Sequence, residues 1–393
     1  MIETELRFAF ISSLCGSPWG GSELLWSQTA ETLRKQGCPV FASVHGWSDT
    51  PQAVVDLRLA NIQVYERHYD SVSVADRTTR VWQRICRKPE TDPVAIRMMG
   101  CMERFNPSLV CISNGATGDG LQWIELCQER GFPYVIIAQA ATEAVWPCDR
   151  NAERLITAYT SAVASFFVSR RNLELLETQL GISLPNAEIV RNPVNVPFES
   201  TCPWPERTTH RQMACVARLD PIAKGQDLLL QVLSDERWRS RDWHLNFYGS
   251  GNNERALKRL RGHLGLTDRV TFHGHVHDIP GVWSQNHILV LPSRFEGLPL
   301  SLVEAMLCGR CAVVTDVAGN TEVVTDGNNG FVAPAPTVPL LAEALQRAWD
   351  RRDQWQAMGL LAAEEIRRRI PQNATAAFAC RLRCLLQPRS LTR

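Results

Sequence analysis

Two glutamates stand in the stretch PSRFEGLPLSLVEAMLCGR, residues 292–310, and their surroundings suit a ligand that carries hydroxyl and anionic groups. A glycine and a proline predict a loop at Glu296, whereas LSLVEAMLC predicts a helix that a glycine closes, with Glu304 about one turn inside it. An ionised carboxylate accepts hydrogen bonds from two neighbouring hydroxyls, and the unpaired amides of a helix start attract an anion. The stretch therefore predicts a binding site.

Two cations lie on an earlier connection, ARLDPIAKGQDLLL, which contains Arg218 and Lys224. The guanidinium group of arginine forks onto phosphate oxygens and lysine acts as a mobile point charge, so the pair suits a diphosphate. For this segment alone, two solvated cations on a loop would be an equally good interpretation.

Two glycine-containing loops follow predicted strands. In GSPWGGSELLW, Gly20 and Gly21 precede a helix predicted to begin near Ser22, an arrangement that brings backbone amides close to a phosphate or a sugar. In YGSGNNERAL, Gly249 begins a Gly-x-Gly loop without the third glycine of the dinucleotide fingerprint. That departure argues against an NAD enzyme.

Two patterns resemble metal or redox sites. His273, His275 and His277 alternate in FHGHVHD and would share one face of a strand as zinc ligands, but the glycine among them favours a strand end and a loop. CGRC, from Cys308 to Cys311, has redox spacing, yet it falls where a helix ends and a strand begins, which favours buried thiols. With no Asp-x-Asp in the chain, we expect no metal and no cofactor.

The length of 393 residues predicts two domains. With 45% hydrophobic residues, 21% charged residues and a net charge of +1, the composition is that of a soluble protein with no general affinity for nucleic acid. Thirteen scattered cysteines, acids in place of a signal peptide's bases and the lack of a long apolar run favour the cytoplasm. Arg367, Arg368 and Arg369 are predicted to form a solvated face, with peripheral contact to the inner face of a membrane as the alternative.

The elements that must position these residues alternate in type. Short apolar runs alternate with amphipathic stretches in residues 1–195, and the alternation restarts in residues 211–371, so each half is predicted to be a doubly wound α/β domain with a parallel sheet. Residues 196–210 are rich in proline and polar residues and predict a linker, with packing of residues 372–393 back on the first domain as a further expectation. Parallel sheets bind ligands at the carboxyl ends of their strands, where these motifs lie.

Four segments in order, ARLDPIAKGQDLLL, FYGSGNNERAL, VTFHGHVHDIPGVW and the stretch from LVLPSRFEGLPL to TDGNNGFV, resemble the retaining glycosyltransferases of family four. The resemblance covers nearly all of the second domain and thins in the first to GGSELLWSQTAETLRKQG. It implies the GT-B fold, in which two Rossmann-like domains face a central cleft. It also implies a nucleoside diphosphate sugar as donor and a hydroxyl acceptor, a glycan or a lipid-linked group, reached from the first domain.

The resemblance also implies roles for residues. Glu296 contacts the transferred sugar, Glu304 the ribose of the nucleotide, and Arg218 with Lys224 the diphosphate. The leaving phosphate assists the incoming hydroxyl, so no catalytic base is required. The other residues expected at the donor are Gly20, Gly21, Gly249, Val276, Gly297, Leu298, Leu300 and Ser301.

The first domain departs from the family pattern at one position. After PYVII the family often carries a histidine near the donor sugar, and here Gln139 takes that place as the second candidate catalytic residue. Glutamine donates and accepts hydrogen bonds but carries no positive charge. Glu143 and Trp146 follow and are candidates for the same cleft, although packing would explain the tryptophan equally well. Two alternatives therefore stay open, a nucleotide-sugar-binding subunit without catalysis and a nucleotide-sugar epimerase.

Overall fold

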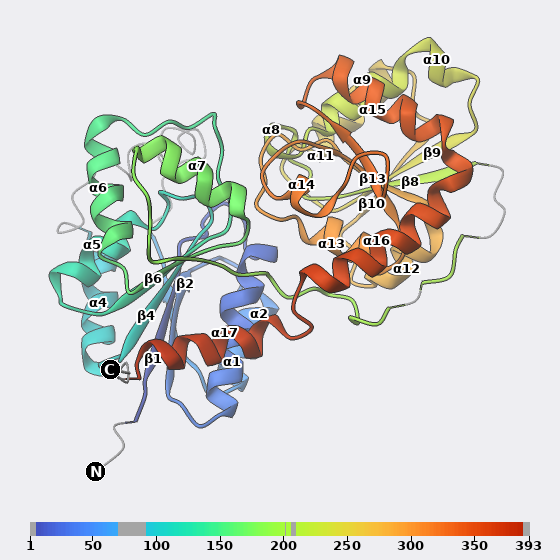
Figure 1. Ribbon diagram of the computed structural model, residues 1–393. Helices are drawn as coiled ribbons and strands as arrows, with labels where there is room; N and C mark the ends of the chain where they lie inside the picture. Colours follow the sequence, from blue (N-terminus) through green and yellow to red (C-terminus); the bar gives the residue numbers. More distant parts are fainter. Residues whose placement is uncertain (1–4, 70–91, 201, 206–209, 388–393) are drawn as a thin grey trace, which may run out of the picture. The chain divides into compact units, whose positions relative to one another are not determined.

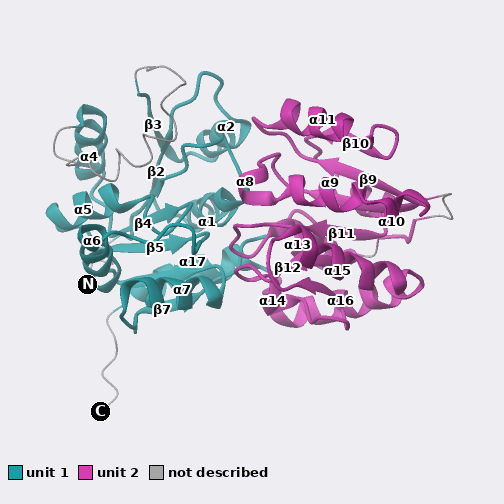
Figure 2. Cartoon of the chain, turned by 90° about the horizontal axis from the view of Figure 1, so that it is seen from above, with its two compact units in different colours: residues 1–193, 373–393 teal, residues 194–372 magenta. Residues whose placement is uncertain are grey.

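The computed structural model describes residues 5–69, 92–200, 202–205 and 210–387. Its contacts divide the chain into two compact units, shown in two colours in Figure 2. Unit 1 comprises Met1–Pro193 and Asn373–Arg393, and unit 2 comprises Val194–Gln372. Each unit has one parallel sheet with helices on both faces, which confirms the prediction of two Rossmann-like α/β domains.

In the described part of unit 1, seven parallel strands form the sheet. They are β1 (Phe8–Ser12), β2 (Val40–His45), β3 (Gln63–Arg67), β4 (Leu109–Asn114), β5 (Tyr134–Ala138), β6 (Ala164–Phe167) and β7 (Ala187–Ile189). Their spatial order is β3-β2-β1-β4-β5-β6-β7, so the order reverses at β1, where Phe8 pairs with Val40 on one side and Leu109 on the other. Such a reversal opens a crevice at the carboxyl ends of the strands.

The helices of unit 1 cover the two faces of this sheet (Figure 1). They are η1 (Gly21–Glu23), α1 (Leu24–Lys35), α2 (Gln52–Leu59), α4 (Pro93–Phe105), α5 (Leu121–Glu129), α6 (Asp149–Thr160), α7 (Arg170–Leu180) and α17 (Ala374–Leu385). Phe8 and Phe10 of β1 pack with α1, α2 and α17, whereas Ala9 and Ile11 face α4 to α7. The C-terminal helix α17 is thus part of unit 1, and residues 388–393 of the segment predicted to return there lie outside the described residues.

Unit 2 has six parallel strands among its described residues, in the order β10-β9-β8-β11-β12-β13. They are β8 (Arg211–Val216), β9 (Trp243–Tyr248), β10 (Val270–Gly274), β11 (Ile288–Leu291), β12 (Cys311–Thr315) and β13 (Gly330–Ala333). The order again reverses at the first strand of the unit, here β8, which lies between β9 and β11.

The helices of unit 2 are α8 (Pro221–Lys224), α9 (Gln226–Ser234), α10 (Glu236–Arg239), α11 (Glu254–His263), α12 (Ile279–Gln285), α13 (Leu300–Leu307), α14 (Asn320–Val323), α15 (Val338–Asp350), η4 (Arg352–Gln354) and α16 (Trp355–Arg369). Met213 and Cys215 of β8 face the buried cluster with α9, α11 and α15. Ala214 faces the other cluster, with α12, α13 and α16. Helix α13, which the sequence predicts, is therefore buried between the sheet and α16.

The described part of the predicted linker packs on unit 2. Val196 is buried among the residues that line α13, and the carbonyl oxygen of Pro203 accepts a hydrogen bond from the buried guanidinium group of Arg310. Residues 201 and 206–209 lie outside the described residues. The proline and polar content of residues 196–210 therefore marks an ordered irregular segment rather than a free connection in the part that the structure describes.

The three arginines at the end of α16 differ in exposure, and the prediction of a solvated face is wrong for Arg367. Arg367 donates to the carbonyl oxygens of Phe198, Ser200 and Leu307. Arg368 and Arg369 are exposed; Arg368 pairs with an acid one turn earlier, and Arg369 donates to two carbonyl oxygens at the end of α14. Among the described residues, no helix has both the length and the apolar character needed to cross a membrane.

Candidate functional site

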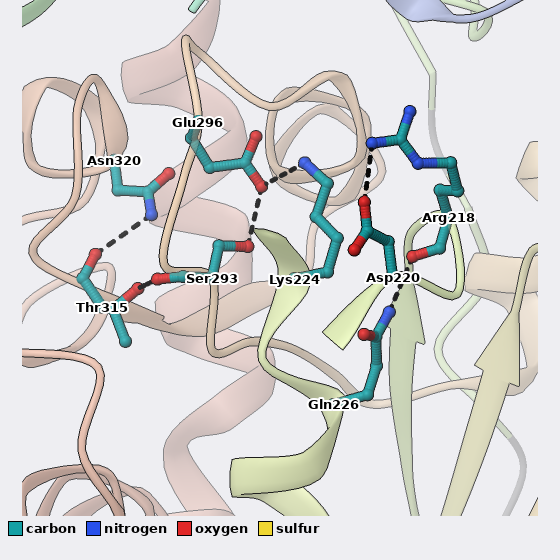
Figure 3. Close-up of polar contacts among 8 residues, drawn as sticks. All are labelled: Arg218, Asp220, Lys224, Gln226, Ser293, Glu296, Thr315 and Asn320. Carbon is teal, nitrogen blue, oxygen red and sulfur yellow. Dashed lines mark hydrogen bonds and ion pairs between the residues drawn. The ribbon is translucent and has the colours of Figure 1, made fainter. Parts of the chain in front are cut away.

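Glu296 lies in the loop that follows β11, at the carboxyl edge of the unit 2 sheet. Its side chain is only 5% exposed, and one oxygen, Oε1, accepts a hydrogen bond from Lys224 Nζ at 2.7 Å and another from Ser293 Oγ at 2.7 Å. Figure 3 shows both bonds on the same oxygen, with the other carboxylate oxygen pointing away from the two donors. The carboxylate is therefore held in one orientation with one oxygen left to meet a ligand.

Lys224 reaches Glu296 because of the glycine that follows it. Helix α8 ends at Lys224, and Gly225 adopts φ 64°, which L side chains rarely adopt. A Cβ atom on Gly225 would lie 2.0 Å from the carbonyl oxygen of Pro292, so the two loops touch through their backbones. The sequence predicts Lys224 at a diphosphate and gives no indication of this ion pair.

Arg218 follows β8 and is the more accessible of the two cations, with 48% of its side chain exposed. Its Nη2 donates to Asp220 Oδ2 at 3.0 Å, and its carbonyl oxygen accepts a hydrogen bond from the buried side chain of Gln226 at 2.8 Å. The backbone is thus fixed while the guanidinium group keeps donors for another anion.

The predicted glycine loop after β9 packs on the backbone beside Arg218. Gly249 adopts φ 133°, and a Cβ atom there would lie 2.1 Å from the carbonyl oxygen of Ala217. A Cβ atom on Gly251 would lie 2.4 Å from the carbonyl oxygen of Leu219. These glycines are required for close packing of the two loops, whatever the ligand. Val276, in the loop after β10, is half-buried against the cluster around α13.

Glu304 lies on α13 and is 3% exposed. Its Oε1 accepts hydrogen bonds from the backbone N and the side-chain Nδ2 of Asn195, both at 2.9 Å. Burial raises the pKa of Glu304 above its usual value, and the two bonds from Asn195 oppose that shift. No pattern in the sequence indicated Asn195.

The start of α13 has free amides, as the sequence predicts. Pro299 precedes the helix without a side-chain cap, and the first amides to bond within the helix are those of Leu302 and Val303, both to the carbonyl oxygen of Pro299. The amides of Leu300 and Ser301 precede them. The preceding loop is tied down, since Leu298 is buried and Gly297 accepts a hydrogen bond from the amide of Gly319 at 2.7 Å.

The candidates in unit 1 lie at the carboxyl ends of β1 and β5. Gly20 is extended, and the chain then forms the short turn η1 at Gly21 before α1 begins at Leu24, slightly later than predicted. Gln139 is 5% exposed, and its Oε1 accepts a hydrogen bond from Asn192 Nδ2 at 2.8 Å. Asn192 is a partner that the sequence did not indicate.

The loop after Gln139 leaves its aromatic residue in solvent. Trp146 is 59% exposed, so packing does not explain it, and Glu143 is exposed as well. Gln179 Nε2 donates to the carbonyl oxygens of Thr142 and Val145 at 3.0 and 3.1 Å, which fixes the shape of the loop.

The histidine and cysteine patterns have other partners. His273 Nε2 lies 2.9 Å from Asn246 Oδ1, while the rings of His275 and His277 contact each other. Cys308 and Cys311 are buried, and burial raises the pKa of Cys308 and raises that of Cys311 to about 12. In the part of the chain that the structure describes, no three His, Cys, Asp or Glu side chains are placed to hold a metal ion.

The buried charge on Glu304 leads to a prediction about stability. Because its pKa is higher in the folded chain, the folded state keeps a proton that the unfolded state loses, so this group's contribution to stability falls as pH rises from about 4.5 through the folded pKa. Glu304→Gln keeps an oxygen for Asn195 and removes the charge. The variant should therefore be more stable than the wild type at pH 7, by urea denaturation, and the difference should shrink towards pH 4. The exposed Glu254→Gln is the matched control, and equal pH dependence in all three proteins would contradict the prediction.

Comparison with known proteins associates this site with sugar transfer. Residues 210–351 match the family model described as "Glycosyl transferases group 1". That range contains β8 to β13 and all the unit 2 candidates except the segment around Asn195. Unit 2 therefore contains a segment similar to that family.

Two curated relatives are named as enzymes that transfer a sugar. The chain is 33% identical over 153 residues to an alpha-D-kanosaminyltransferase of Streptomyces kanamyceticus, covering 38% of this chain and 36% of that protein. It is 27% identical over 242 residues to a GDP-mannose-dependent alpha-(1-6)-phosphatidylinositol monomannoside mannosyltransferase of Mycolicibacterium smegmatis, covering 56% of this chain and 62% of that protein. The chain thus spans less than two thirds of the length of either relative.

Solved structures resemble nearly the whole chain. A crystal structure of Anabaena HepE in complex with UDP has a TM-score of 0.73 at 16% identity and covers 96% of this chain and 100% of that one. Sucrose-phosphate synthase from Thermosynechococcus elongatus has a TM-score of 0.74 at 17% identity, covering 97% and 99%. At these identities the similarity establishes the two-unit fold and says nothing of the reaction.

Proposed function

We propose that the chain is a retaining glycosyltransferase of family four, which transfers a hexose from a nucleoside diphosphate sugar to a hydroxyl group of a glycan or a glycolipid. The observation that carries the proposal is the cluster of Lys224, Ser293 and Glu296 at the carboxyl edge of the unit 2 sheet, inside the segment that matches the family model. Glu304, on the helix α13 that follows this loop, supplies the second carboxylate, with seven residues between the two glutamates.

The residues support a division of the donor into three parts. Arg218 and the amides of Leu300 and Ser301 suit the diphosphate, because cations and helix-start amides both stabilise a developing negative charge. Glu296 presents one oxygen to the hydroxyls of the sugar, and Glu304 accepts from the ribose. Transfer then proceeds on one face of the sugar, with the leaving phosphate oxygen taking the proton of the incoming hydroxyl as the new bond forms.

The test is incubation of the full chain with UDP-glucose and with GDP-mannose, the donors named with the HepE structure and the mycobacterial relative. Nucleoside diphosphate should be released, slowly with water as acceptor and faster with a suitable glycoside, and NMR of the product should show the donor's anomeric configuration. Binding of UDP or GDP without release would favour the non-catalytic subunit, and an epimerised nucleotide sugar would favour the epimerase.

The diphosphate assignment predicts an effect of Arg218. A hydrogen bond to a charged group is worth about 1.5–3 kcal/mol, so Arg218→Ala should weaken UDP or GDP binding about tenfold or more. Calorimetry measures the change. Arg237→Ala is the matched control, because Arg237 also pairs with an aspartate two residues away and is 61% exposed. Unchanged affinity in Arg218→Ala would remove this residue from the site.

A further prediction is that turnover survives excess EDTA. The described residues include no carboxylate or histidine cluster suited to a metal ion, and in this proposal Arg218, Lys224 and the start of α13 supply the positive charge. Loss of nucleotide release in EDTA, restored by adding a divalent cation, would contradict the prediction and return attention to His273, His275 and His277.

A further inference from the structure

Ser293 is a buried residue that no pattern in the sequence indicated. It is fully buried between β11 and Glu296, and its hydroxyl donates to Glu296 Oε1 at 2.7 Å. The same oxygen accepts from Lys224, whose side chain is 20% exposed. Glu296 therefore has two donors of different kinds, a cation nearer the surface and a neutral hydroxyl in the interior.

The backbone that carries the Ser293 side chain is held by a chain of hydrogen bonds, which Figure 3 shows from one end to the other. Thr315 Oγ1, at the end of β12, donates to the carbonyl oxygen of Ser293 at 2.6 Å. Asn320 Nδ2, at the start of α14, donates to the carbonyl oxygen of Thr315 at 3.0 Å. All three residues are fully buried. Residues at the ends of two neighbouring strands and at the start of the next helix thus hold the backbone of Ser293, and the hydroxyl bonds Glu296 from that fixed position.

We propose that Ser293 is the positioning residue of Glu296, and that the chain from Asn320 through Thr315 sets the orientation in which Glu296 meets the transferred sugar. This inference rests on the proposed function. Lys224 is drawn to a bound diphosphate, because that group carries more negative charge than one carboxylate. Ser293 has no charge and keeps its bond to Oε1 when Lys224 moves, so Oε2 stays directed at the sugar hydroxyls.

The test is a double-mutant cycle with Ser293→Ala, Glu296→Gln and the double variant. The readout is release of UDP from UDP-glucose or of GDP from GDP-mannose, whichever the wild type hydrolyses. Ser293→Ala should lower turnover about tenfold and leave the KM for the donor within about threefold, since the lost bond acts on the reacting sugar. In the Glu296→Gln background the same change should lower turnover less than about twofold, because Ser293 acts only through Glu296.

The controls separate positioning from folding and from the proposed function. Ser284→Ala removes a hydroxyl that bonds Gly281 on α12 and should leave turnover unchanged. Thr315→Val should lower turnover in the same Glu296-dependent way, so a Ser293→Ala variant that fails to fold does not end the test. A tenfold loss that persists in the Glu296→Gln background, or full turnover in Ser293→Ala, overturns the inference and leaves the glycosyltransferase proposal intact. A wild type that releases nucleotide from neither donor overturns both.

Discussion

Arg310→Ala should lower the free energy of unfolding by about 4 kcal/mol, because it breaks a buried hydrogen-bond network. Arg310 is 1% exposed. Its Nε donates to the carbonyl oxygens of Trp283 and Asn286 at 3.0 and 2.8 Å, and its Nη1 donates to that of Cys308 at 2.7 Å. Its Nη2 donates to Pro203, which belongs to the segment that enters unit 2.

The loss of stability in Arg310→Ala comes from the buried carbonyl groups that would lose their hydrogen-bond donor. The guanidinium group binds the ends of α12 and α13 and the segment before β8, and its hydrogen bonds go to carbonyl oxygens. Burial lowers the pKa of Arg310, yet arginine stays charged in any folded protein. Without it, several buried carbonyl groups lose their donors at once, and each unpaired group costs about 1–3 kcal/mol before water and local rearrangement compensate in part.

Urea denaturation of the full chain, followed by tryptophan fluorescence, measures this change. Arg369→Ala is the matched control, because Arg369 also binds two carbonyl oxygens but has a side chain that is 35% exposed. We expect the control to lose about 1 kcal/mol or less, since water replaces a donor at the surface. Equal losses in the two variants would show that burial of the Arg310 network has no special role.

The sequence predicts the sheets well because their signals are local. Apolar runs and amphipathic stretches alternate along the chain, and the central strands of each parallel sheet are buried on both faces, so their apolar composition reveals them. The edge strands β3, β7 and β10 are only partly buried and give a weaker signal. The predicted helix at LSLVEAMLC and its closing glycine are also local features, and α13 ends with Gly309 at φ 74°. Because strand ends share one edge of a sheet, the positions of Arg218 and Glu296 follow from the same alternation.

The contacts within the site could not be predicted, since they join residues far apart in the sequence. Lys224 and Glu296 are 72 residues apart, and Asn195 and Glu304 are 109 apart. Asn195 belonged to the first domain in the sequence analysis, whereas in the structure it lies in unit 2. The spacing of the cysteines in CGRC suggested a redox role. The residue of this segment with the most hydrogen bonds is instead Arg310, although arginine side chains usually lie at the surface.

The close approach of Lys224 changes what is expected of Glu296→Gln. The glutamine is similar in shape and keeps one oxygen for Lys224 and Ser293, but it places an amide NH₂ group where the second carboxylate oxygen was. A group that accepted hydrogen bonds from sugar hydroxyls now only donates. Turnover should therefore fall about 100-fold, the size of effect seen when one preorganised electrostatic contact to a transition state is removed.

The affinity for free nucleotide should not fall with the turnover rate in Glu296→Gln. In the wild type, a diphosphate competes with Glu296 for Lys224, whose ammonium group bonds the carboxylate at 2.7 Å. Glu296→Gln removes the charge of that competitor, so UDP or GDP should bind as tightly as to the wild type or slightly more tightly. Glu304→Gln should instead weaken the binding of both nucleotides, because the ribose loses the carboxylate that accepts its hydrogen bonds. Calorimetry measures the affinity for the nucleotide, and turnover with the donor measures the reaction, so together they separate the two variants. The control for the substitution itself is Glu254→Gln, which changes an ion pair on α11. Weaker nucleotide binding in Glu296→Gln, or full turnover in it, would show that Glu296 does not serve the transferred sugar.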